Sequence, residues 1–356
     1  MSSATDRRAN VKRPRASLSD QIEAAIESGS NARDEASSLQ DNDEGAQAEQ
    51  QRRKAEKYFR RALLLNPKES RAYYGLGNIN FDRAAYSNSD AALNAAWLAA
   101  EGAYKQAIRL KPDYADAYYG LGEVYSSERR DPEAIEQYKQ AIRFDPNYVS
   151  AYDKLGFAYR SQERYSEGSE QFRKAISLSP DYAERYNRYD TLGELYYLQQ
   201  RYPEAIEQYQ QAIRLKTAKK SLDPNGDPDV VWSYIGLGKT YHAQQRYEEA
   251  IGLFKEAIRL SSKSKPCSGY NELGFTYYAQ QRYLEAIEQY KQAIHCPDQP
   301  EAYYNLGRAY LKTNNKSAAM EQYEAIKKIA ATAPYESMKK RWLKYADKLL
   351  SEINQH

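Results

Sequence analysis

Histidine and cysteine are scarce in this chain of 356 residues, so few groups are available for nucleophilic, acid–base or metal chemistry. The three histidines are His242, His295 and His356, and the two cysteines are Cys267 and Cys296. His295 and Cys296 are adjacent, and they would supply the imidazole and thiolate ligands that zinc prefers. A closed zinc site needs a second ligand pair at a suitable spacing, and the sequence contains none. We therefore expect no metal site.

An acidic stretch is the second place where a cation could be considered. Asp223, Asn225, Asp227 and Asp229 alternate along a segment with two prolines and a glycine, which predicts a loop. An EF-hand loop needs glycine at its sixth position and glutamate at its twelfth. Here the glycine is misplaced and the twelfth position is Tyr234. Calcium binding is therefore not expected.

The remaining charged residues show no arrangement typical of catalysis. There is no glycine-rich phosphate loop. Carboxylate and lysine pairs are frequent, but their spacing places them on exposed helix faces, where ion pairing explains them. We predict a protein that is not an enzyme and that needs no cofactor.

The elements that carry these residues follow a repeat built on the dipeptide Leu-Gly. Successive copies are 45, 34, 37, 45, 36 and 33 residues apart. A period near 34 residues is typical of a helical repeat array. The copies are Leu76-Gly77, Leu121-Gly122, Leu155-Gly156, Leu192-Gly193, Leu237-Gly238, Leu273-Gly274 and Leu306-Gly307.

Residues 115–148 illustrate one unit of the repeat. Apolar and small residues recur at spacings of three and four in two segments with a polar stretch between them, which predicts two helices and a turn. Pro132 suits the first turn of the second helix, and Pro146 ends that helix. The framework positions are Tyr118, Leu121, Gly122, Tyr125, Ala134, Tyr138 and Ala141.

This frame of aromatic, Leu-Gly, Tyr, Ala, aromatic, Ala and Pro resembles the tetratricopeptide repeat (TPR), over about residues 52–333. The resemblance implies an all-α fold, a right-handed α-solenoid of antiparallel helix pairs (a TPR superhelix) with a C-terminal capping helix. Glycine and alanine are expected where two helices cross closely, because a larger side chain would separate them. The aromatic residues are expected to fill the gaps between units.

Three parts are predicted along the chain. Residues 1–48 are expected to be a disordered tail that can include a short helix, and residues 49–333 the TPR array of about seven repeats. Within the array, residues 49–65 are predicted to form an N-terminal cap. The alternative is that residues 17–30 supply the first helix of an additional repeat. Residues 334–356 are predicted to be the capping helix, because apolar residues from Trp342 to Ile353 form one stripe opposite lysines.

The two spacings of 45 residues imply insertions of 11 residues, near 78–99 and 216–230. Eleven residues are close to three helical turns, so the first insertion can lengthen both helices, to 70–85 and 90–110. Trp97 lies off the repeat frame there, and it either packs inside the long hairpin or offers a second partner contact. The second insertion, from Lys216 to Asp229, is predicted to be a loop.

The resemblance also implies where a ligand binds. In TPR folds the first helix of each unit lines a concave groove, and its exposed positions lie around the Leu-Gly. These positions combine aromatic residues with charged residues of both signs. Such a mixture suits the binding of a peptide or helix of a partner protein. The positions are Tyr74, Asn78, Tyr119, Glu123, Asp153, Phe157, Arg160, Asp190, Glu194, Tyr197, Lys239, His242, Asn271, Phe275, Tyr278, Tyr304 and Arg308.

Two other functions stay open at this point. Tyrosine and phenylalanine could stack on the bases of RNA or single-stranded nucleic acid, although Glu123, Asp153 and Glu194 would repel phosphates. The chain could also be the regulatory subunit of a separately encoded enzyme. Our leading hypothesis is a non-catalytic scaffold or adaptor that binds a protein partner.

The composition indicates a soluble protein of the cytoplasm. Two cysteines are too few for a disulfide scaffold and fit a reducing compartment. No stretch approaches the roughly 20 apolar residues of a membrane span, and the net charge of +3 gives no general attraction to nucleic acid. The basic segment Lys12-Arg13-Pro14-Arg15 leaves a nuclear location as the alternative.

Overall fold

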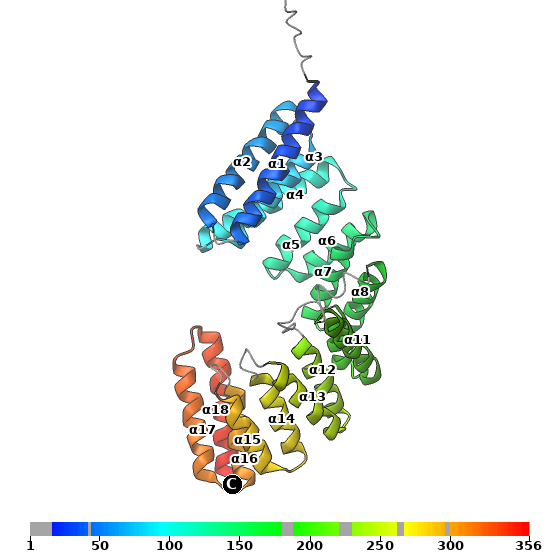
Figure 1. Cartoon of the computed structure of the whole chain (residues 1–356). Helices are drawn as coiled ribbons and strands as arrows, with labels where there is room; N and C mark the ends of the chain where they lie inside the picture. Colours follow the sequence, from blue (N-terminus) through cyan, green and yellow to red (C-terminus); the bar gives the residue numbers. More distant parts are fainter. Residues whose placement is uncertain are drawn as a thin grey trace, which may run out of the picture. The chain divides into compact units, whose positions relative to one another are not determined.

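The computed structural model describes residues 16–41, 44–87, 89–179, 188–220, 230–261, 267–295 and 300–355 (Figure 1). Within these ranges the regular elements are α-helices, and the helices pair in sequence order. The predicted all-α repeat fold is therefore confirmed. The chain divides into two compact units, unit 1 (Met1–Glu163) and unit 2 (Arg164–His356).

Unit 1 consists of three helix pairs followed by a further helix. In each pair the two helices are joined by a short turn and pack on each other, and the second helix also contacts the first helix of the next pair. The helices are α1 (Leu18–Asp41), α2 (Gly45–Leu65), α3 (Ser70–Ala85), α4 (Asp90–Leu110), α5 (Ala115–Ser127), α6 (Asp131–Phe144) and α7 (Val149–Ser161).

Unit 2 repeats the same arrangement and ends in a single helix. Its pairs are α10 with α11, α12 with α13, α14 with α15 and α16 with α17. The bounds are α8 (Tyr165–Leu178), α10 (Arg188–Leu198), α11 (Tyr202–Lys220), α12 (Val230–Ala243), α13 (Tyr247–Leu260), α14 (Cys267–Ala279), α15 (Tyr283–Ala293), α16 (Pro300–Lys312), α17 (Lys316–Ala331) and α18 (Glu336–Gln355).

Buried aromatic rings seated on glycine hold neighbouring helices together. Tyr104 of α4 lies between Gly77 of its own pair and Gly120 of the next pair, and a Cβ atom at either glycine would come within 2.6 Å of the ring. Tyr209 of α11 lies in the same way between Gly193 and Gly236. Because such distances exclude any larger side chain, the close crossings expected at glycine are observed.

Several turns between consecutive helices share one backbone conformation. At the same place in six turns, a residue other than glycine has φ between 57° and 62°: Arg129, Glu163, Gln200, Gln245, Gln281 and Asn314. Arginine follows in several of these turns, and its guanidinium lies over a tyrosine of the preceding helix. For example, Arg282 lies 4.4 Å from the ring centroid of Tyr277 and also pairs with Glu285. These contacts fix the angle between the two helices of a pair.

The N-terminal prediction is wrong for residues 18–41, which form the long helix α1 instead of part of a disordered tail. Helix α1 packs antiparallel to α2, with Gly29 against the ring of Phe59. Apart from Ile26 its buried residues are small, which lowered the hydrophobic contrast in an acidic, serine-rich sequence and concealed the helical period beyond residue 30. The buried residues are Ala25, Ile26, Gly29, Ala32 and Ala36.

The two insertions behave differently from each other. Helices α3 and α4 have the predicted bounds, but Trp97 is buried, 8% exposed, with its ring edge-on to Phe81 at 5.1 Å. Trp97 therefore packs inside the long hairpin, which is the first of the two alternatives. The loop predicted from Lys216 begins later, because α11 continues to Lys220. The acidic stretch between residues 221 and 229 lies outside the described residues.

Helix α18 closes unit 2 at the predicted place. Trp342, Ala346, Leu349 and Ile353 are buried on one face. Leu349 lies against Gly307, at 2.6 Å from a Cβ built there, whereas the corresponding Gly274 faces Tyr290 of its own pair. In the last pair, the side chain that packs on the glycine of the Leu-Gly thus comes from α18, whereas in the other pairs it comes from the second helix.

Cys267, at the start of α14, is disulfide-bonded. The other cysteine of the sequence, Cys296, lies outside the described residues. The small number of cysteines was expected to fit a reducing compartment, and a disulfide at Cys267 is unusual in such a compartment.

Candidate partner-binding surface

The predicted partner-binding residues all lie on first helices, because they are placed at helical spacing before and after the Leu-Gly. In unit 1 they occupy α3 (Tyr74, Asn78), α5 (Tyr119, Glu123) and α7 (Asp153, Phe157, Arg160). In unit 2 they occupy α10 (Asp190, Glu194, Tyr197), α12 (Lys239, His242), α14 (Asn271, Phe275, Tyr278) and α16 (Tyr304, Arg308).

Polar residues of this set in unit 1 are bound to second-helix tyrosines. Asn78 accepts a hydrogen bond of 2.8 Å from the hydroxyl of Tyr104. Glu123 accepts one of 2.6 Å from the hydroxyl of Tyr138 and one of 2.7 Å from Lys154 Nζ. Burial, together with the charge of Glu123, raises the pKa of Tyr138, so its hydroxyl remains a donor. These side chains hold the helices together.

The aromatic residues of the set in unit 1 are also largely covered. Tyr74 packs on Tyr114 at 5.2 Å, and Tyr119 packs on Tyr148 at 5.0 Å. Asp153 is 6% exposed. Phe157 differs, since it is 40% exposed. In this unit, Phe157 is the most prominent apolar group that the predicted set offers to a partner.

In unit 2 the corresponding surface is built from stacked rings. The imidazole of His242 on α12 lies parallel to the ring of Phe275 on α14, at 4.8 Å and 28°. Its Nδ1 atom lies 3.0 Å from Thr276 Oγ1. Burial lowers the pKa of His242, which keeps the imidazole neutral near pH 7 and compatible with stacking. Phe275 itself is 41% exposed, so the stack presents an apolar face to solvent.

The same surface continues from α14 to α16. Tyr278 meets Tyr283 edge-on at 5.3 Å, and the guanidinium of Arg308 lies 5.1 Å from the ring centroid of Tyr278. Two first helices thus contribute an aromatic ring and a cation side by side. We call His242, Phe275, Tyr278 and Arg308 the aromatic strip of unit 2.

A polar row accompanies the aromatic strip. Lys239 Nζ lies 3.8 Å from Glu272 Oε1, and Asn305 Nδ2 donates to Asn271 Oδ1 at 3.2 Å. Burial raises the pKa of Glu272, and the nearby Lys239 partly opposes this change. Glu272 and Asn305 are absent from the predicted set. Their shared position, directly before the Leu-Gly, is the signal that would have found them.

The end of this surface is covered by α18. Tyr304 is 4% exposed, and its hydroxyl donates to Glu352 at 2.7 Å. Glu352 also pairs with Arg308 at 3.1 Å, and Lys348 lies 5.1 Å from the ring centroid of Tyr304. A partner therefore meets Arg308 more readily than Tyr304.

At the start of unit 2, α10 contributes charges that are already engaged. Asp190 forms an ion pair of 2.5 Å with Lys216, which is 3% exposed. Tyr197 lies near Tyr202, at 6.0 Å between ring centroids. This part of the predicted set stabilises the pairing of α10 with α11.

Across the described ranges, no three His, Cys, Asp or Glu side chains are grouped so that they could hold a metal ion. A separate finding concerns membranes: among the helices of these ranges, none has the length and apolar character needed to cross one.

The helices pair in sequence order, aromatic rings pack on glycine where they cross, and the first helices carry aromatic side chains on their surface. These features place the chain in the class of helical-repeat proteins. The chain belongs to the tetratricopeptide-repeat family. Sequence profiles described as TPR repeat or tetratricopeptide repeat match residues 45–101, 100–127, 130–162, 148–218, 191–265, 274–314 and 300–332.

Several solved structures are similar to this chain at low sequence identity. A tetratricopeptide repeat protein from Parabacteroides merdae is 15% identical, with a TM-score of 0.54 over 77% of this chain and 98% of that one. Yeast Tom70 is 16% identical, with a TM-score of 0.48 over 96% of this chain and 66% of Tom70. The pilF protein of Pseudomonas aeruginosa is 18% identical, with a TM-score of 0.46 over 65% and 96% of the two chains. Comparison of the sequence with curated proteins gives no significant match.

Proposed function

We propose that the protein is a non-catalytic scaffold or adaptor that binds a peptide or helix of a partner protein along its first helices, in the concave groove typical of TPR arrays. The observation that carries the proposal is the aromatic strip of unit 2. The rings of His242 and Phe275 stack on each other, and Phe275 is still 41% exposed. Rigid, partly exposed aromatic groups beside a cation are typical of the anchors of protein interfaces.

The polar row supports a protein ligand over a nucleic acid. Glu272 follows Asn271 in α14, Asn271 accepts a hydrogen bond from Asn305, and Glu123, Asp190 and Glu194 lie on other first helices. Carboxylates on the binding face would repel phosphates and remove the electrostatic attraction on which nucleic-acid binding depends. Amide and carboxylate groups instead suit the backbone and the cationic side chains of a peptide.

Co-purification tests the proposal. Tagged wild-type protein, Phe275→Ala and Phe157→Ala are purified from the native host. Leu284→Ala is the matched control, because Leu284 is 74% exposed but lies on the second helix α15. We expect a defined protein that is lost with Phe275→Ala and retained with Leu284→Ala. Nucleic acid in its place, or a protein that stays bound to Phe275→Ala, would overturn the proposal.

The cytoplasmic location predicted from the sequence rested partly on the small number of cysteines, which fits a reducing compartment. The disulfide of Cys267 removes that argument, because reducing compartments disfavour structural disulfides. Alkylation of the protein in intact cells, without reductant, tests the location. Labelling of Cys267 would support the cytoplasm, and protection would support an oxidising compartment.

A further inference from the structure

The two helices of the first pair carry opposite charges. Helix α1 contains six acidic residues and one arginine, whereas α2 contains six basic residues and two glutamates. Both helices lie at the N-terminal end of unit 1, where they contact α3 on one side only. Charge separated in this way between neighbouring helices is not needed for the packing of the pair.

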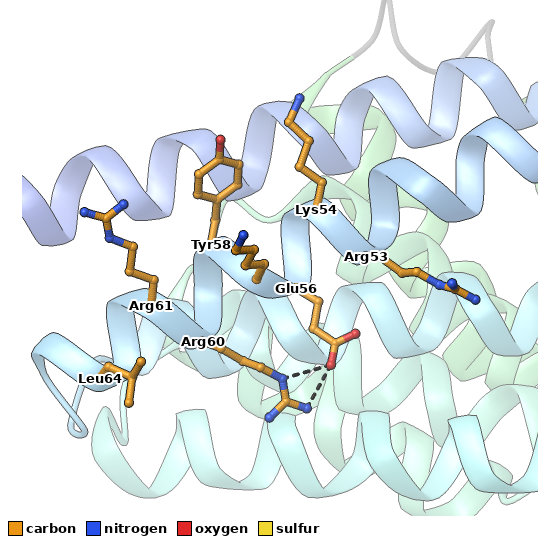
Figure 2. Close-up of a pocket in the computed structure, with 8 residues that line it drawn as sticks. Arg53, Lys54, Glu56, Tyr58, Arg60, Arg61 and Leu64 are labelled. Atoms are coloured by element: carbon orange, nitrogen blue, oxygen red, sulfur yellow. Dashed lines mark hydrogen bonds and ion pairs between the residues drawn. The ribbon is translucent and has the colours of Figure 1, made fainter.

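Five of the six basic residues form a stripe on the outer face of α2, whereas Arg52 is buried. Figure 2 shows their side chains projecting from this helix around a surface pocket of about 720 Å³. Arg53 and Arg60 are 77% and 68% exposed, and each pairs with a glutamate one turn earlier. Lys54, Lys57 and Arg61 are exposed and make no ion pair within the described part of the chain. The stripe therefore keeps an excess of unneutralised positive charge.

Helix α1 carries a matching row of acids. Glu27 and Asp34 are exposed and seven residues apart, and neither makes an ion pair in the ranges that the structure describes. Lys54 and Arg61 are also seven residues apart. Seven residues rise about 10.5 Å along a helix, so both spacings agree. Two ion pairs can therefore form at once between an α1 helix and an α2 helix.

The acidic residues of α1 and the basic residues of α2 also lie at matching heights along the hairpin. Gln51 donates to Glu35 at 2.8 Å, and Phe59 lies against Gly29, so α1 and α2 run antiparallel with known alignment. Asp34 is therefore level with Lys54, and Glu27 is level with Arg61, to within about one turn. The open end of the same hairpin carries two exposed leucines, Leu18 at 57% and Leu64 at 85%.

We propose that the α1–α2 hairpin is a self-association surface, on which a second copy of this chain pairs its acidic α1 with the basic α2, and its basic α2 with the acidic α1. A two-fold arrangement makes both contacts equivalent. The exposed leucines add apolar contact at the ends of the hairpin. This surface is independent of the aromatic strip of unit 2.

A charge-swap experiment on the full chain tests the proposal. The α2 variant is Lys54→Glu/Arg61→Glu, and the α1 variant is Glu27→Lys/Asp34→Lys. All four side chains are exposed, and circular dichroism checks that each variant folds. The mass in solution is measured by analytical ultracentrifugation at low salt and at about 0.5 M salt, where screening is strong.

We expect a wild-type dimer that dissociates at high salt, and at least a tenfold weaker association for either variant alone. An equimolar mixture of the two variants restores the dimer, and so does one chain that carries all four substitutions. The proposal is overturned if the wild type is a monomer at low salt, or if the variants associate as the wild type does. It is equally overturned if the mixture of variants fails to associate, which would point to an acidic partner other than a second copy.

Discussion

The first helices of unit 1 and unit 2 have the same framework but use their outward positions differently. In unit 1, Asn78 and Glu123 accept hydrogen bonds from the buried tyrosines of second helices. In unit 2, His242 and Phe275 stack on each other, and Phe275 remains partly exposed. These positions thus mainly stabilise helix pairing in unit 1, where Phe157 is the exposed exception, and present an apolar surface in part of unit 2.

The largest expected effect tests whether the two units share one kind of core. Tyr104→Ala in unit 1 and Tyr290→Ala in unit 2 each remove a fully buried ring that lies on glycine. We expect each to lower the free energy of unfolding of its unit by about 3–5 kcal/mol. Urea unfolding followed by circular dichroism measures both. A loss in one unit only would show that the cores differ as well as the surfaces.

The hydroxyl groups of two buried tyrosines give a sharper comparison. Tyr138→Phe leaves Glu123 without its 2.6 Å donor, so we expect a loss of about 1–3 kcal/mol. Tyr290→Phe is the matched change in unit 2, where the described residues offer that hydroxyl no hydrogen bond, and we expect less than about 0.5 kcal/mol. Equal losses from the two substitutions would contradict the contrast between the units.

All three histidines lie in unit 2, so the stability of unit 2 is expected to depend on pH near neutrality more than that of unit 1. Burial lowers the pKa of His242 below the ordinary value of 6.5, so the unfolded chain binds a proton before the folded one does. The free energy of unfolding of unit 2 should therefore fall as the pH drops through about 6.5 towards the lower folded-state pKa. His242→Gln should flatten this dependence. An unchanged slope in the variant would assign the effect to another group.

The smallest effect concerns the turns, which both units share. Arg129 and Gln281 adopt φ of 59° and 62°, a conformation that glycine adopts without strain. We expect Arg129→Gly and Gln281→Gly each to raise the free energy of unfolding by about 0.5–1 kcal/mol. Asn314→Gly is the control, and its effect should be smaller because asparagine tolerates this conformation. A destabilising result in either unit would mean that the replaced side chain contributes more than the strain costs.

The framework could be predicted from the sequence because each framework residue has one physical role in every unit. Gly77 and Gly274 stand where a ring crosses, and the bounds of α3 and α4 followed from the spacing between Leu-Gly pairs. Helix α1 was predicted only in part, because alanine and glycine form most of its buried face. Trp97 lies off the repeat frame, so the pattern left open whether it packs inside the hairpin, and the structure places it on Phe81 of the paired helix.

The surface was harder to predict than the framework. The repeat gives the positions that face outward, but it does not give the partner of each side chain. Asn78 and Phe275 occupy comparable positions, yet Asn78 bonds to Tyr104 and Phe275 stacks on His242. The covering of Tyr304 by Glu352 depends on α18, which lies outside the repeat.

The affinity of the co-purified partner for the full chain tests the central claim most directly. Isothermal titration compares wild type, Phe275→Ala and the control Leu284→Ala. We expect Phe275→Ala to weaken binding by about tenfold or more, because it removes the exposed ring of the aromatic strip, and Leu284→Ala to change it by less than about twofold. Equal affinities for the wild type and Phe275→Ala would contradict the claim that this strip binds the partner.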